Sequence, residues 1–479
     1  MLSTSPTHTD TIPKGSWWSR ARRSHVGVAA VVALTLFTDM LTYGAILPVL
    51  PTLIIKKLKG DSAMVGFLFG CYAFGLLIAT PVFAILSDKY QNRRVPMMAG
   101  CLGLVASTLS FAAAETYSLL VVARVAQGVA GGASWTIGLG LLADVFPTKR
   151  LGVVMGTVLT AHTVGFAIGP AAGGFLFEYG GYSAPFLCCT AFAILNFFAV
   201  LWVAEPPHNK QYTTNTKAKY TQDGHGDEEA STAASSIRSN IMEDEIEDEG
   251  AIIPSSSPHP TEDTPLIKNK TREQKQPITI LSLCKNWRIM SCVLCTVVSS
   301  SVFSGIEPAF PIHLEKAYDA SASTVGFIFV FMVIPAFLAP LVGHLSDRIG
   351  RYIISATGML MMAVAAPLVA IHYSSVYWII PSLMVFGLSS TVTLTPILPE
   401  MGEVVYDLGG NAYAQVYALY NMAYSAGMFF GPNVAGLIMD YSGFGTLMIT
   451  FAVALLICSP VMMDWKLVWR YMIRLITRG

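Results

Sequence analysis

Twelve long apolar stretches constrain this chain more than any other feature of its sequence. A helix needs about 20 mostly apolar residues to cross the hydrocarbon core of a bilayer. Lipid offers no hydrogen-bond partners to the backbone, so a segment that crosses it must pair its own amide groups, as a helix does. We therefore expect an all-α membrane protein with twelve transmembrane helices in a lipid bilayer. The expected spans cover residues 26–50, 65–86, 95–113, 118–142, 152–176, 184–204, 287–311, 322–345, 352–371, 377–399, 412–438 and 444–464.

The composition agrees with a chain that is solvated mainly by lipid. Only 13% of the 479 residues are charged, whereas soluble proteins carry about 25%. Thirty basic residues balance thirty acidic ones, so the net charge gives no sign of a nucleic-acid partner, and none is expected. The sequence has no GxxxxGK, HExxH or nucleophile-elbow motif, which argues against an enzyme and against ATP as the energy source.

One CxxC motif, at Cys292 and Cys295, stands at the start of a span without a second pair nearby. Zinc and redox sites normally need more ligands or a different context. We interpret these cysteines as packing residues and expect neither a metal nor a cofactor.

A polar stretch divides the spans into six and six. Residues 205–285 are rich in Ser, Thr, Pro and charged residues, a composition that buries too little apolar surface to fold. We expect a disordered cytoplasmic linker between two six-helix bundles. The expected organisation is a tail, a bundle, the linker, a second bundle and a tail, at residues 1–25, 26–204, 205–285, 286–464 and 465–479.

The basic residues predict the orientation of the spans. Twenty-five of the thirty Lys and Arg residues fall on the side of the amino terminus when the spans are counted in order. Short loops rich in Lys and Arg stay in the cytoplasm, so both termini are expected there. The first span follows a polar, basic segment and is too long for a cleavable signal sequence.

The two halves of the chain repeat each other. Pro48 matches Pro308 at an offset of 260 positions, and Asp88 matches Asp347 at 259. A Gly and Pro pattern in the fifth span recurs in the eleventh at 262, where Gly165, Gly169, Pro170 and Gly174 match Gly427, Gly431, Pro432 and Gly436. These ordered matches indicate a parallel internal duplication, and duplicated transporters place their site between the two copies.

With these motifs the chain resembles the major facilitator superfamily. LSDRIGR from Leu345 is similar to the loop signature of that family, ARVAQG from Ala123 to its fourth-helix motif, and GFAIGPAAGG from Gly165 to its antiporter motif. The resemblance implies roles in gating and conformational change for Asp88, Arg93, Gly165, Gly169, Pro170, Gly174, Asp347, Arg348 and Arg351.

Within that superfamily the chain is most similar to drug and amine proton antiporters, particularly the vesicular amine transporters. The resemblance is carried by Asp39 in TDMLTYGAILPVLP, Glu307 in GIEPAFPI and Arg124 in ARVAQG. It implies proton-coupled export or sequestration of a cationic or amphipathic organic solute. Three positions depart from the pattern, because a lysine and two aspartates of those transporters are replaced by Tyr72, Thr391 and Asn421.

Asp39, Arg124 and Glu307 are the ionised side chains that fall clearly inside spans. Such residues are costly in hydrocarbon and are usually functional, so we expect them to couple transport to protons. Helix depth at 1.5 Å per residue puts Glu307 near the level of Arg124, which predicts an ion pair. Asp39 would then lack a cationic partner, and it could bind either a proton or a cationic substrate. A purely structural ion pair is the alternative for Arg124.

Aromatic and amide side chains on the first, fourth, seventh and eleventh spans can complete a substrate pocket with Asp39 and Glu307. Aromatic faces attract organic cations, although core packing is an alternative for each of them. The candidates are Tyr43, Trp135, Phe310, Tyr417, Tyr420 and Asn421. His162 and His344 are interpreted as satisfied or loop histidines rather than proton relays.

The linker carries a possible sorting signal. Glu262, Leu266 and Ile267 fit an acidic dileucine pattern that docks on sorting adaptors, which predicts a vacuolar or other acidic organelle membrane, with the plasma membrane as the alternative. Two other functions remain open, namely proton-driven uptake of a small nutrient and a transporter-like membrane receptor.

Overall fold

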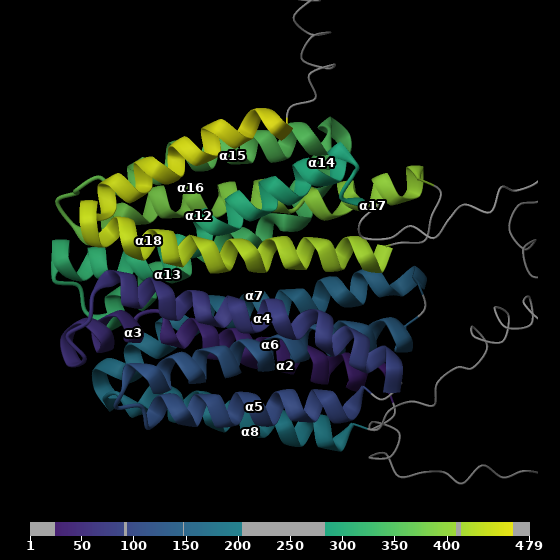
Figure 1. The fold of residues 1–479 in the computed structure, drawn as a ribbon, viewed down its shortest axis with the longest axis horizontal. Helices are drawn as coiled ribbons and strands as arrows, with labels where there is room; N and C mark the ends of the chain where they lie inside the picture. The colour runs from purple at the N-terminus through teal and green to yellow at the C-terminus, as the bar shows by residue number, and fades with distance from the viewer. Residues whose placement is uncertain (1–23, 91–92, 147, 204–282, 409–412, 463–479) are drawn as a thin grey trace, which may run out of the picture. The chain divides into compact units, whose positions relative to one another are not determined.

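The computed structural model of the protein describes residues 24–90, 93–146, 148–203, 283–408 and 413–462 (Figure 1). The expected linker lies almost wholly outside these ranges, and so do the sorting residues Glu262, Leu266 and Ile267. Both stay predictions. The side chain of Asp88 also lies outside the described part of the structure.

The first half folds into six helical segments. The first of them is α2 (His25–Ile46), which is continued by the short α3 (Val49–Thr52) and by the π-helical turn η1 (Leu53–Lys57). The others are α4 (Ser62–Tyr90), α5 (Arg94–Ala112), α6 (Tyr117–Val145), α7 (Thr148–Gly180) and α8 (Ser183–Trp202).

The second half repeats this arrangement with more interruptions. Its segments are α12 (Trp287–Tyr318), then α13 (Ala322–Val333), η2 (Ile334–Leu338) and α14 (Ala339–Ile349), then α15 (Arg351–Val369). They are followed by η3 (Val376–Ile379), α16 (Ile380–Leu394), α17 (Ile397–Asp407), α18 (Tyr413–Cys458) and η4 (Ser459–Met462).

Eleven segments of the described chain are long and apolar enough to cross a membrane, and the last of them is two helices. Its 48 residues would extend about 70 Å at 1.5 Å per residue, more than twice the hydrocarbon thickness of about 30 Å. Its backbone leaves the helical conformation at Gly443 (φ 80°, ψ 176°), where the absence of a Cβ makes a positive φ inexpensive. The structure therefore has the twelve transmembrane helices expected.

The expected ends of the first and seventh spans are too early. The helical segments run to Lys57 and Tyr318, seven residues beyond the expected ends at 50 and 311. The prolines near these ends do not stop the helices, because a proline removes only one backbone donor. Pro48 does interrupt the first segment between α2 and α3, whereas Pro308 and Pro311 lie inside an unbroken α12.

The two halves pack in the same way. In the first half α2 packs against α7 and α4 against α6; in the second half α12 packs against α18 and α13 against α16. Figure 1 shows the first half in purple and blue below the second half in teal to yellow. The bundles meet where α4 packs against α18 and α7 against α13. The internal duplication is thus visible in the helix pairs.

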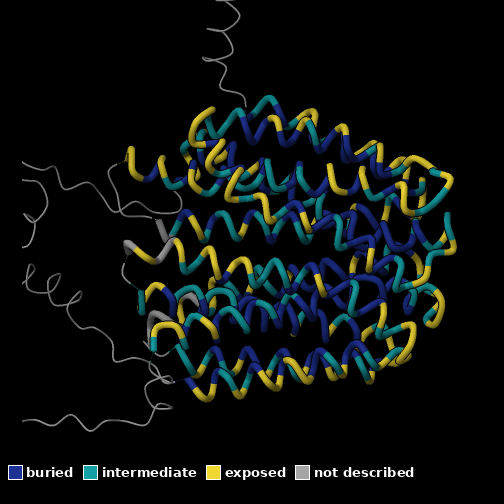
Figure 2. The backbone as a smooth tube through the Cα atoms, turned by 180° about the vertical axis from the view of Figure 1, so that it is seen from behind, coloured by how far each residue is buried: buried dark blue, intermediate teal, exposed yellow. Residues whose placement is uncertain are grey.

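Large apolar side chains point away from the bundles. Ile85, Val122 and Val364 are 70%, 63% and 65% exposed. Figure 2 shows exposed stretches of the helices along the periphery and buried stretches mostly inside. In water such a surface would be unfavourable, whereas lipid tails solvate it.

Backbone contacts close one side of the interface between the bundles. We call the side on which α2 begins the inner side and the opposite one the outer side. Near the outer side, a Cβ atom at Gly326 of α13 would collide with the carbonyl oxygen of Pro170 of α7. A Cβ atom at Gly66 of α4 would likewise collide with the carbonyl oxygen of Pro432 of α18. These two pairs form a glycine seam that lets the bundles touch backbone to backbone.

Polar contacts join the same outer ends. Lys56 Nζ lies 2.5 Å from Glu315 Oε1, and Glu178 accepts a hydrogen bond of 3.2 Å from the backbone N–H of Ser323. Between residues that the structure describes, the hydrogen bonds and ion pairs that link the two bundles all lie in the outer halves of the helices. The structure therefore represents an outer-closed state.

Substituting a glycine of this seam should open the outer side. Gly326→Ala introduces a methyl group against the Pro170 carbonyl, and such overpacking costs about 1–3 kcal/mol. Cysteines placed at Lys56 and Glu315 should therefore crosslink about fivefold less in this variant than in the parent, as 1 kcal/mol corresponds to a factor of about five. Gly156→Ala is the matched control, because nothing lies within 4 Å of a Cβ atom there. Equal crosslinking in both variants would contradict the role of the seam.

Candidate functional site

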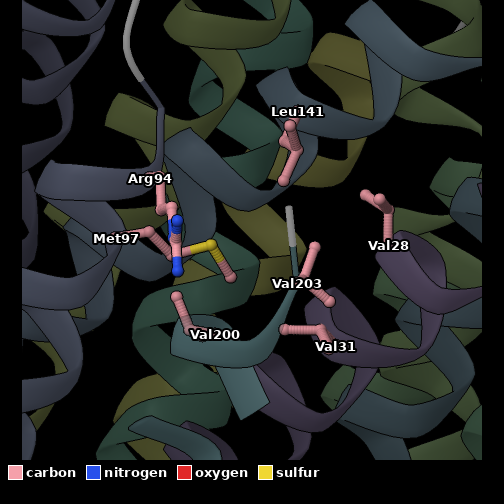
Figure 3. Close-up of a pocket in the computed structure, with 7 residues that line it drawn as sticks. All are labelled: Val28, Val31, Arg94, Met97, Leu141, Val200 and Val203. Atoms are coloured by element: carbon pink, nitrogen blue, oxygen red, sulfur yellow. The ribbon is translucent and has the colours of Figure 1, made fainter. Parts of the chain in front are cut away.

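A cavity of about 390 Å³ lies between the two bundles. Cavities of about 300–1,000 Å³ hold small organic ligands. Side chains of α2, α4, α6 and α7 line it on one face, and side chains of α12, α13, α16 and α18 on the other. A second cavity, which Figure 3 shows between Arg94 and six apolar side chains, has about 20 Å³, room for about one water molecule. Only the larger cavity suits an organic solute.

Asp39 presents a buried carboxylate to this cavity. It is 4% exposed, and the hydroxyl of Tyr72 donates a hydrogen bond of 3.3 Å to its Oδ2. Its Oδ1 has no partner among the residues that the structure describes. The absence of a side chain at Gly131 makes room for the carboxylate, since a Cβ atom there would lie 3.0 Å from Oδ2.

Glu307 is the second carboxylate of the cavity, and it faces the other bundle. It is 2% exposed, and its Oε2 accepts a hydrogen bond of 2.5 Å from the hydroxyl of Tyr43. Tyr43 belongs to α2 and Glu307 to α12. This hydrogen bond therefore joins the two bundles at the cavity.

Arg124 lies behind these groups rather than in the cavity lining. Its side chain is fully buried, and Nη1 donates a hydrogen bond of 2.9 Å to Gln127 Oε1. Four aromatic rings surround the guanidinium with centroids 4.9–5.9 Å from Cζ, those of Tyr43, Phe69, Tyr72 and Phe111. Rings at this distance stabilise a desolvated cation.

The expected direct ion pair between Arg124 and Glu307 is wrong for this state. Tyr43 contacts both partners, the guanidinium with its ring and the carboxylate with its hydroxyl. Helix depth predicted a common level, but it did not specify which side chains point towards each other around the helix axis. In the described ranges neither Lys nor Arg forms an ion pair with Asp39.

Two tyrosines connect the carboxylates. Tyr72 bonds Asp39, Tyr43 bonds Glu307, and the two phenol rings lie 4.7 Å apart between centroids. The guanidinium of Arg124 lies over the rings of both tyrosines, and its single positive charge cannot balance two ionised carboxylates. The arrangement can therefore attract a cation or hold a proton.

The structure brings four of the expected pocket residues into the cavity lining, Tyr43, Trp135, Tyr420 and Asn421. The other two expectations are wrong. Phe310 is fully buried against the rings of Phe329 and Phe444, and Tyr417, nearer the inner end of α18, is 45% exposed outside the lining.

Several lining residues escaped the sequence analysis, including the apolar side chains Met40, Phe166, Phe303, Met332 and Met428. Tyr424 also lines the cavity, and its spacing of four from Tyr420 was a signal for the same helix face. His162 lines the cavity as well, with its ring 5.1 Å from that of Trp135. Within the described ranges no group of three or more His, Cys, Asp or Glu could hold a metal ion.

The expected gating residues on the inner side form ion pairs inside each bundle. Arg351 contacts Asp347 at 3.1 Å and Glu403 at 2.5 Å, and Arg93 contacts Asp144 at 2.5 Å. Glu403 follows Asp144 by 259 positions and Arg351 follows Arg93 by 258, so the same pair occurs in both halves. Arg348 is exposed at the end of α14.

The expected conformational residues of α7 face two neighbours. A Cβ atom at Gly169 would lie 2.8 Å from Gly44 Cα of α2, and one at Gly165 would collide with the carbonyl oxygen of Phe37. Gly174 instead meets Ala322 of the opposite bundle. The glycines of α7 thus let one face of this helix pack against α2 of its own bundle and another face pack against the other bundle.

Removing the hydroxyl of Tyr43 should weaken the link between the bundles. Tyr43→Phe keeps the ring beside Arg124 but leaves Glu307 without its donor, a loss of about 1–3 kcal/mol for a buried acceptor. We expect a lower Tm and less crosslinking between cysteines at Lys56 and Glu315. Tyr182→Phe is the control, because its hydroxyl bonds Phe111 within one bundle. A change in crosslinking in the control alone would contradict this prediction.

Comparisons with known proteins agree on the family. The model of the Major Facilitator Superfamily matches residues 32–291 and 292–471. An uncharacterised MFS-type transporter of Schizosaccharomyces pombe is 26% identical over 447 residues, with 90% of this chain and 93% of the relative covered. The human synaptic vesicular amine transporter is 24% identical over 413 residues, with 85% and 67% covered.

A solved structure shares the fold. A crystal structure of a bacterial homologue of the human lysosomal transporter Spinster superposes with a TM-score of 0.66 at 15% identity, covering 94% of this chain and 97% of the other. At that identity the likeness concerns the fold alone.

Proposed function

Because the chain belongs to the major facilitator superfamily of membrane transporters, we propose that it is a proton-coupled antiporter that moves a cationic or amphipathic organic amine. The observation that carries this proposal is Asp39, a buried carboxylate that faces the cavity and forms no ion pair with a Lys or Arg that the structure describes. The similarity to vesicular amine transporters supports the same substrate class.

The exchange follows from competition at Asp39. Burial disfavours an isolated carboxylate, so this group gains free energy from binding either a proton or an organic cation. The cavity around it is lined by aromatic and thioether side chains, such as Trp135, Tyr420 and Met40, which suit the apolar body of such a cation. If only occupied states reorient, one species leaves as the other enters.

Glu307 would couple the exchange to the movement of the bundles. Outward opening must break the hydrogen bond from Tyr43. An ionised carboxylate accepts that bond more strongly than a protonated one, so protonation of Glu307 favours opening of the outer side. In this proposal the proton that enters from the outer side loosens the contact that keeps that side closed.

The direction of transport follows from the orientation. We propose that the inner side is cytoplasmic, in agreement with the distribution of Lys and Arg, and that the outer side faces an acidic lumen. A vacuolar or vesicular membrane provides the required proton gradient, and the relatives named as vesicular support this location. Adaptor binding through Glu262, Leu266 and Ile267 would direct the protein there.

Replacing Asp39 should abolish coupled transport without unfolding the protein. In proteoliposomes with an acidic interior, we expect wild-type protein to take up at least one of tyramine, spermidine and ethidium. Asp39→Asn removes the titratable group and should reduce this uptake to background, while its Tm stays near that of wild type.

The matched control is Asp440→Asn, which makes the same chemical change at an exposed position of α18. It should transport like wild type. Full pH-driven uptake by Asp39→Asn would overturn the role of Asp39. Wild-type protein that binds a probe in a thermal-shift assay but never exchanges it for protons would overturn the antiport proposal and favour a receptor.

A further inference from the structure

One imidazole lines the central cavity, and nothing above gives it a role. His162 of α7 reaches the cavity beside Trp135 of α6, with ring centroids 5.1 Å apart at an angle of 66°. Neither ring nitrogen has a hydrogen-bond partner among the described hydrogen bonds of this part of the chain. Its nitrogens are therefore available to water or solute in the cavity.

His162 lies on the inner side of Asp39. Gly131 of α6 faces the Asp39 carboxylate, and Gly165 of α7 packs against the Phe37–Leu41 segment of α2. Helix α7 runs from the inner side to the outer side, and His162 precedes Gly165 in it by three residues. Helix α6 runs in the opposite direction, and Trp135 follows Gly131 in it by four residues. At 1.5 Å per residue, both rings lie about 5 Å closer to the inner side than Asp39.

Among the described side chains that line the cavity, the imidazole of His162 is the one nitrogen base. Neither Lys nor Arg is among the side chains that line this cavity in the described structure. The titratable groups that share the cavity with it, from both bundles, are Asp39, Tyr43, Tyr72, Glu307, Tyr420 and Tyr424. The carboxylates across the cavity attract positive charge, and a neutral imidazole can accept a proton at one ring nitrogen and release one in turn.

Water can connect the two groups. The 390 Å³ of the cavity is many times the ~10–15 Å³ that one water needs, so the cavity holds several waters when no solute is bound. A proton can cross such a distance by transfer along hydrogen-bonded water, without contact between Asp39 and His162.

We propose that His162 is a proton-relay residue. In the outer-closed state it accepts the proton that Asp39 releases and passes a proton to the solution on the inner side. The O–H bond of the Asp39 carboxylic acid breaks and a bridging water takes up that proton. The water passes one of its own protons to the neutral imidazole, which leaves a carboxylate and an imidazolium. The imidazolium then returns one proton to water on the inner side, so the imidazole is neutral again and one proton has moved inwards. This role rests on the antiport proposed above.

The test separates movement of protons from movement of solute. Two assays use wild type and His162→Gln in proteoliposomes with labelled tyramine, or with spermidine or ethidium if wild type prefers them. The first measures uptake driven by an acidic interior, which needs proton release. The second measures exchange of labelled for unlabelled probe at equal pH, which needs binding and reorientation but no net proton movement.

We expect His162→Gln to lose about tenfold or more of the pH-driven rate, the scale of a missing proton-transfer group, while the exchange rate stays within about twofold of wild type. Imidazole added to the medium should restore part of the pH-driven rate by entering the cavity. His344→Gln, a change of the same kind at an exposed position of α14, should leave both rates unchanged.

The other outcomes contradict the proposal in distinguishable ways. Equal pH-driven rates in wild type and His162→Gln would overturn the role of His162 while the antiport stands. Loss of both pH-driven uptake and exchange, without rescue by imidazole, would identify His162 as a substrate contact or a structural residue instead. Absence of pH-driven uptake in wild type for every probe would instead overturn the proposed antiport itself.

Discussion

The hydrogen bond from Tyr43 to Glu307 joins the two bundles at the central cavity, between two side chains that are each about 2% exposed. A buried acceptor that loses its donor costs about 1–3 kcal/mol, so this contact resists separation of the bundles. The glycine seam at Gly66 and Gly326 and the ion pair between Lys56 and Glu315 lie further towards the outer side and close the same interface. Closure of the outer side and the chemistry of the cavity thus depend on one another.

Tyr43 also explains how the chain tolerates three buried ionisable groups. Its ring separates Arg124 from Glu307, and the guanidinium is stabilised by aromatic faces and by Gln127 instead of by a carboxylate. Beside Asp39 stands Tyr72, whose hydroxyl lies 3.3 Å from the carboxylate. A phenol can donate to Asp39 but cannot neutralise it, so the carboxylate stays open to other cations.

The duplication produced a symmetric frame around an asymmetric site. The helix pairs, the glycine seam and the inner pairs Arg93–Asp144 and Arg351–Glu403 occur in both halves. The two carboxylates of the cavity do not occur in both halves. At the offset of 260, Asp39 corresponds to Ser299 and Glu307 corresponds to Leu47. In the proposed antiporter the repeated frame would let the halves rock against each other, and the single copies of Asp39 and Glu307 would give each bundle a different part in binding.

The sequence by itself determined the helical membrane fold, the repeat and the identity of the buried charges. In hydrocarbon a long apolar helix can satisfy its own backbone, and each charged side chain within such a helix is costly and therefore conspicuous. Asp39, Glu307, Trp135 and Tyr420 could be placed at the cavity from the buried charges, the internal repeat and the resemblance to amine transporters, although the same reasoning placed Phe310 and Tyr417 there wrongly. Only the tertiary structure decided that Tyr43 separates Arg124 from Glu307, that Phe310 packs away from the cavity and that His162 reaches it. Such details depend on the rotation of each helix about its axis and on the tilt between bundles, which side chains from distant parts of the chain set together.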